Sequence, residues 1–114
     1  MTHSKSMRKK LRELKMEAHE REIKKHLVDL SKKFDKWKED KMTSGELSIH
    51  IHEYDKGPSK WMMGFYNDLD PTACVARAVA IGLLSRDEVP ADILEIIGNQ
   101  IDYFENENKR GKKK

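Results

Sequence analysis

The first third of the chain is a polar segment in which apolar residues recur at helical spacing. Residues 6–41 contain no proline and no glycine, and lysine, glutamate, leucine and arginine dominate them. All four favour helix, so the pattern predicts one helix of up to 36 residues. At 1.5 Å per residue such a helix is about 54 Å long. A compact body of this size cannot cover that length, so part of the helix is expected to project or to meet a partner.

The apolar positions of this helix fall into two stripes. The first has the three-and-four spacing of a packed seam and comprises Met16, Ile23, Leu27, Leu30, Phe34 and Trp37. The second comprises Met7, Leu11, Leu14 and Ala18. At 100° per residue the two stripes point in roughly opposite directions. Residues 18–22 contain no helix breaker, so a continuous helix is favoured over one that breaks near His19–Glu22. In that helix the first stripe faces the chain's own core and the second stripe binds another surface.

A helix is also predicted for residues 44–56. Thr43 and Glu46 have the spacing of a capping box, in which each side chain bonds the backbone N–H of the other residue. A strand over residues 46–54 is the alternative, because apolar and polar residues alternate there. We favour the helix, since no nearby segment offers a second strand for pairing.

Proline and glycine divide the rest of the chain into three further helices. Gly57–Pro58 is expected to end the second helix and to begin a short third one. Asp70–Pro71 is typical of the start of a helix, here over residues 72–84, and its many alanines predict a central position. Ser85–Glu88 is a second capping pattern, and Val89–Pro90 leads into a final helix. The predicted fold is therefore all-α, with a long N-terminal helix packed on a compact bundle of about four shorter helices.

The predicted domain organisation follows from these elements. Residues 1–5 are expected to be a disordered N-terminus and residues 6–106 a single helical domain. Within that domain, residues 6–41 form the long helix and residues 42–106 the compact helical body. Residues 107–114 are expected to be a disordered basic tail. Apolar residues make up 37% of the chain and charged residues 38%, which suits a small core that carries one long solvated element.

Targeting and redox features indicate a cytoplasmic protein. The longest apolar stretch, residues 73–84, contains Arg77 and is far shorter than the about 20 residues that span a bilayer. No apolar segment follows the basic N-terminus, so a secretory signal is not expected. Cys74 is the single cysteine, which rules out an intramolecular disulfide and is interpreted as a buried thiol.

The remaining chemistry-bearing residues match no catalytic pattern. His19-Glu20 and His52-Glu53 each begin the zinc-protease motif His-Glu-x-x-His, but Ile23 and Lys56 occupy the position of the second histidine. His26 shares a helix face with His19, yet that face is dense with lysine and arginine and is interpreted as solvated. We therefore expect no catalytic site, no metal and no cofactor. An active site assembled from distant helices is the alternative.

The charge distribution suggests two kinds of partner. The net charge is +6 over residues 1–41, −7 over residues 42–106 and +4 over residues 107–114. Our leading hypothesis is a non-enzymatic interaction or regulatory protein that self-associates, or binds another protein, through the stripe of Met7, Leu11, Leu14 and Ala18. In a homodimer, the basic arm of one subunit would lie on the acidic body of the other. The alternative is a nucleic-acid-associated accessory protein. Its contacts would be Lys5, Arg8, Lys9, Lys10, Arg12, Lys109 and Arg110.

Overall fold

The computed structural model describes residues 4–112, and every regular element in that part of the chain is helical. The elements are α1 (Lys5–Lys38), α2 (Ser44–Tyr54), the π-turn η1 (Asp55–Ser59), α3 (Lys60–Asp68), α4 (Pro71–Ala80), the short 3₁₀ turn η2 (Arg86–Glu88) and α5 (Ala91–Lys112). The prediction of an all-α fold with a long N-terminal helix packed on shorter helices is confirmed.

The first helix, α1, is continuous through residues 18–22, as favoured. Its N-terminus is capped by Ser4, whose hydroxyl accepts a hydrogen bond from the Met7 backbone N–H at 3.1 Å. Lys36 and Lys38 occupy its last turn, where positive charge complements the partial negative charge of a helix C-terminus. The helix begins one residue before the predicted start, so the prediction of disorder is wrong for residues 4 and 5, and it ends three residues before the predicted end.

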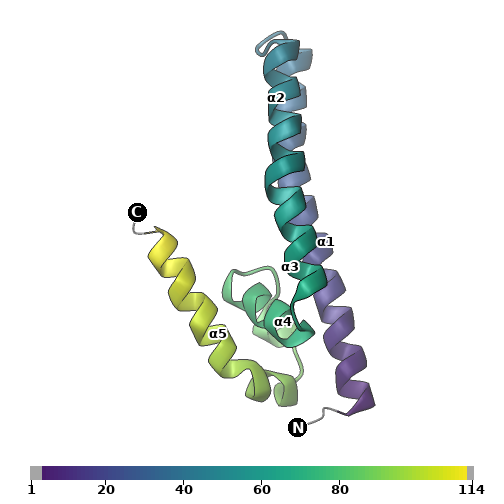
Figure 1. The fold of residues 1–114 in the computed structure, drawn as a ribbon, viewed down its shortest axis with the longest axis vertical. Coiled ribbons are helices and arrows are strands. Elements are labelled where there is room, and N and C mark those ends of the chain that lie inside the picture. The colour runs from purple at the N-terminus through teal and green to yellow at the C-terminus, as the bar shows by residue number, and fades with distance from the viewer. Residues whose placement is uncertain (1–3, 113–114) are drawn as a thin grey trace.

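A second helical arm runs antiparallel to α1 and consists of α2, η1 and α3 (Figure 1). Thr43 and Glu46 form the predicted capping box, with bonds of 3.0 and 3.1 Å, and the preference for helix over strand is confirmed. The prediction that Gly57–Pro58 ends this helix is wrong. The backbone continues through η1, where the wider π-turn accommodates the ring and missing N–H of Pro58. We call α1 together with this arm the helical hairpin.

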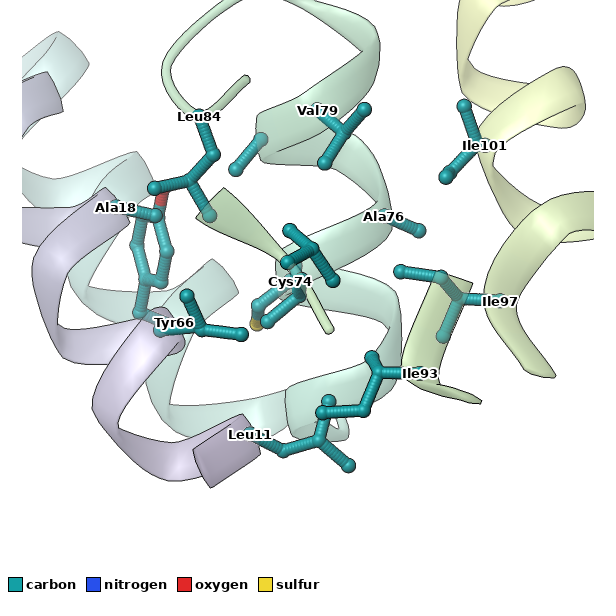
Figure 2. Packing of buried hydrophobic residues seen from close by; sticks show 14 of the residues in the cluster. Leu11, Ala18, Tyr66, Cys74, Ala76, Val79, Leu84, Ile93, Ile97 and Ile101 are labelled. Carbon is teal, nitrogen blue, oxygen red and sulfur yellow. The ribbon is translucent and has the colours of Figure 1, made fainter. Parts of the chain in front are cut away.

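The hairpin carries α4 and α5 on one side of the half that contains the chain's N-terminus (Figure 1). Side chains from α1, α3, α4 and α5 meet in one buried cluster (Figure 2). The alanine-rich α4 contacts α1, α3 and α5, which confirms its predicted central position. It ends at Ala80 instead of residue 84 because Gly82 adopts a φ of 85°, a left-handed conformation that glycine accepts without strain.

The final helix is longer than predicted. It runs to Lys112, so the prediction of disorder is wrong for residues 107–112. Arg110 pairs with Glu107 at 3.4 Å across one helical turn, a spacing that supports an exposed helix. Residues 1–3 and 113–114, also predicted to be disordered, lie outside the described residues. Among the helices of residues 4–112, none combines the length and apolar character needed to cross a membrane.

Candidate interaction surface

A buried ion pair joins α1 to α4. The Arg77 guanidinium donates two parallel hydrogen bonds to the Glu22 carboxylate, Nη1 to Oε1 and Nη2 to Oε2, both at 2.9 Å. The Tyr66 hydroxyl on α3 donates a third bond to Glu22 Oε1 at 2.7 Å. One carboxylate thus accepts charge-assisted bonds from two other helices, which fixes α1, α3 and α4 relative to one another.

These hydrogen bonds keep Glu22 ionised. Glu22 is 6% exposed, and burial by itself would raise the pKa of its carboxyl. The bonds from Arg77 and Tyr66 outweigh burial, so the pKa of Glu22 lies below its ordinary value. Burial and the bond to ionised Glu22 together raise the pKa of Tyr66. Near neutral pH Glu22 is therefore ionised and Tyr66 is protonated, so neither group exchanges a proton and the cluster is structural.

Aromatic rings cover the ion pair. The Arg77 guanidinium carbon lies 4.6 Å from the Trp61 ring centre and 4.9 Å from the Phe65 ring centre. The Trp61 and Phe65 rings stack at 5.0 Å, and His19 stacks on Tyr66 at 4.3 Å. Cation–π contact of this kind strengthens as water is excluded. Residue spacing in the sequence does not predict this cluster; its one signal there is Arg77, the single charged residue in the apolar stretch of residues 73–84.

The stripe predicted to bind a partner faces the chain's own core. Leu11, Leu14 and Ala18 are only 3%, 5% and 0% exposed, and Met7 packs against the same cluster. Figure 2 shows Leu11 and Ala18 of α1 turned toward the α4 and α5 side chains. The prediction that this stripe points away from the core is wrong. The buried side of α1 continues at Glu22, whose charged side chain interrupts the apolar pattern of the stripe.

The other stripe is covered only in part by the chain itself. Leu30, Ile23 and Phe34 are half-buried, whereas Met16 is 71% exposed and Leu27 45% exposed. The prediction that this stripe faces the core is therefore wrong for Met16, Leu27 and Trp37, the last of which is 36% exposed. A single layer, the arm of α2, η1 and α3, packs beside it, and one helix cannot enclose a full apolar stripe.

The contact between α1 and α2 has two different sides. One side holds a hollow lined mainly by charged and histidine side chains, namely His26, Asp29, Lys33, His50 and Glu53. Asp29 lies seven residues after Glu22, so this side is the one that carries α4. Leu27 directly follows His26 on α1, and Ile51 directly follows His50 on α2. Each is therefore rotated by 100° from its histidine and lies on the other side of the α1–α2 contact.

We call that opposite side, turned away from α4 and α5, the back face. Met16, Ile23, Leu27 and Phe34 share it because their spacings are seven, four and seven. Met63 belongs to it as well, since it lies 200° around α3 from Trp61, which contacts Arg77 of α4. The back face thus comprises Met16, Leu27, Phe34, Ile51 and Met63, with Ile23 at its edge, where it also packs against the buried cluster. Ile51 is 40% exposed and Met63 60% exposed.

The residues predicted to contact nucleic acid lie at two separate places. The first group is on the opening two turns of α1, and the second is near the end of α5: Lys5, Arg8, Lys9, Lys10 and Arg12, then Lys109 and Arg110. Figure 1 shows the start of α1 at the bottom of the molecule and the end of α5 higher and on the left. The structure does not bring the two groups together, and Arg110 is paired with Glu107.

The single cysteine is buried, as predicted. Cys74 is 0% exposed, and its Sγ lies 4.0 Å from the Phe65 carbonyl oxygen and 3.9 Å from that of Leu69. Burial raises the pKa of its thiol, which makes the reactive thiolate scarce. In residues 4–112, no group of three or more histidine, cysteine and acidic side chains is arranged to hold a metal ion.

No family model matches this chain, and no curated protein or solved structure matches it.

Proposed function

We propose that the protein is a non-enzymatic interaction protein that acts as a homodimer, with the back face of the hairpin as its contact surface. The observation that carries the proposal is the alignment of exposed apolar side chains along one side of three helices, α1, α2 and α3. Met16, Leu27, Ile51 and Met63 are 40–71% exposed. Single exposed apolar side chains are ordinary in folded proteins, whereas an aligned set is typical of an interaction site.

The half of the hairpin that is distant from α4 and α5, residues 23–54, lacks a core of its own. Between residues 23 and 54, all of which the structure describes, Leu47 is the one residue that is buried. Two antiparallel helices leave most of their apolar side chains partly open to water. Four helices enclose them, as in a four-helix bundle. A second hairpin placed on the back face would supply the two missing helices.

Charge favours a second copy of this chain as the occupant. Residues 24–38 of α1 contain six lysines and two aspartates, a net charge of +4. The adjacent α2 contains Glu46 and Glu53 with no lysine or arginine, a net charge of −2. A two-fold axis can place α2 of each subunit beside α1 of the other, so that opposite charges meet twice.

Introduction of charged side chains on the back face tests the proposal. The double variant Leu27→Glu with Ile51→Glu is expected to convert the dimer to a monomer, because each glutamate would be desolvated in the contact. The matched control is Leu69→Glu with Ile96→Glu, which makes the same two changes at residues of similar exposure, 41% each, outside the back face. The measurement is molar mass by light scattering on a sizing column.

The proposal requires the wild type and the control to elute with the mass of two chains and the back-face variant with the mass of one. Far-UV circular dichroism should show equal helix content in all three, since every substituted side chain is substantially exposed. A wild type that is monomeric at 100 μM, or a back-face variant that is still dimeric, would overturn the proposal.

A further inference from the structure

A second surface lies on the first two turns of α1 and has a different chemistry from the back face. Lys5, Lys9 and Arg12 recur at spacings of four and three and so share one side of the helix. Together with Ser6 and Arg8 they line a shallow hollow, and no acidic residue lines it. Lys5, Lys9 and Arg12 are all exposed.

The apolar residues of these turns leave the surface purely cationic. Met7 and Leu11 are turned into the core, so neither lies among the basic side chains. Asp70 lines an adjacent hollow together with Arg8 and Arg12, so the lining that is free of acidic side chains is that of the first hollow. Met16, four residues after Arg12 and seven after Lys9, continues the same side of the helix and is 71% exposed, so the basic surface borders the apolar back face.

We propose that this basic surface binds the phosphate groups of duplex nucleic acid without reading the base sequence. Lys5 and Arg12 are separated by about 10 Å along the helix axis. Duplex DNA carries about six phosphate charges over the same length, enough for each of the three cations to meet one. No aromatic side chain lies on the basic surface to stack on a base, so the binding rests on charge alone. The basic surface adjoins the back face at Met16, but its test is separate from that of the dimer because it changes neither Leu27 nor Ile51.

The experiment is a titration of fluorescein-labelled duplex DNA with the full chain, followed by anisotropy at several salt concentrations. Three phosphate contacts predict that log K falls against log salt with a slope of about −3. The test variant is Lys5→Gln, Lys9→Gln and Arg12→Gln. Each lost contact should weaken binding about eightfold at 0.1 M salt, so the triple variant should lose more than a hundredfold.

A matched control removes three positive charges elsewhere. Lys56, Lys60 and Lys109 are exposed on η1, α3 and α5, and their replacement by glutamine changes the net charge equally. The control is expected to keep the wild-type slope. Equal losses in the two triple variants would overturn the proposal. So would a wild type that fails to bind DNA at 50 mM salt, or one that binds phosphatidylserine vesicles and not DNA.

Discussion

Replacing Glu22 with alanine is expected to destabilise the protein by about 3–5 kcal/mol. The variant leaves the Arg77 guanidinium without its carboxylate, and the Arg77 side chain is only 16% exposed, so water cannot readily replace the lost bonds. The Tyr66 hydroxyl loses its acceptor at the same time. Because a domain of this kind is stable by about 5–15 kcal/mol, the loss is a large part of the total. Urea unfolding followed by circular dichroism at pH 7 measures it.

Removal of both charges is the control for the Glu22 variant. The double variant Glu22→Leu with Arg77→Met replaces the ion pair by apolar side chains, a change that is often close to neutral. We therefore expect it to be clearly more stable than Glu22→Ala. A loss below 1 kcal/mol for Glu22→Ala, or a double variant equally unstable, would contradict the role assigned to this pair.

The same ion pair should make the protein sensitive to acid. The folded pKa of Glu22 is lowered below its ordinary value of 4.5. Its contribution to stability is therefore complete above pH 4.5 and is lost as the pH falls through the lower, folded pKa. The free energy of unfolding of the wild type should decline below pH 4.5 more steeply than that of the Glu22→Leu, Arg77→Met variant. Equal slopes for the two proteins would contradict the expectation.

The double variant Leu11→Glu with Leu14→Glu is expected to abolish the folded state. Both leucines are almost completely buried, so two carboxylates would enter the core without partners. Each uncompensated buried charge costs several kcal/mol, and together they approach the whole stability of the domain. Loss of the cooperative thermal transition in circular dichroism is the readout.

The opposite side of α1 provides the control for that variant. Met16→Glu with Leu27→Glu makes the same chemical change in the same helix, at side chains that are 71% and 45% exposed. This control should keep its helix content and a cooperative transition. If the Leu11, Leu14 variant also unfolded cooperatively, these leucines would not be core residues.

Capping residues made the start of α2 predictable from the sequence, whereas the side of α1 that faces the core was not predictable. Thr43 and Glu46 act locally, so their spacing is sufficient evidence. The core side of α1 passes through Glu22, and glutamate is almost never buried without a partner. That partner, Arg77, is 55 positions away in the chain. Sequence periodicity contains no information about such a pairing, so it does not reveal that the side of α1 with Leu11 and Leu14 faces the core.

The course of the second arm shows a similar limit. Gly57–Pro58 has the composition of a helix end, yet η1 carries the helix through it. A helix can continue past a proline when the residues after the proline pack on the same helix as the residues before it. Here α3 continues along α1 and contributes Tyr66 to Glu22, so continuation is stabilised by tertiary contacts. The exposure of the back face could not be predicted from the sequence either, because it depends on how much of α1 the second arm covers.

The most direct test of the dimer is an isotope-filtered NOE experiment on a mixture of ¹³C-labelled and unlabelled chains. It detects only contacts between protons of different subunits. The Leu27 and Ile51 methyl groups of labelled chains should show NOEs to unlabelled chains, and the Ile96 methyl groups of α5 should show none. An absence of such NOEs from Leu27 and Ile51 in the concentrated protein, or their appearance at Ile96 instead, would contradict the assignment of the back face as the dimer contact.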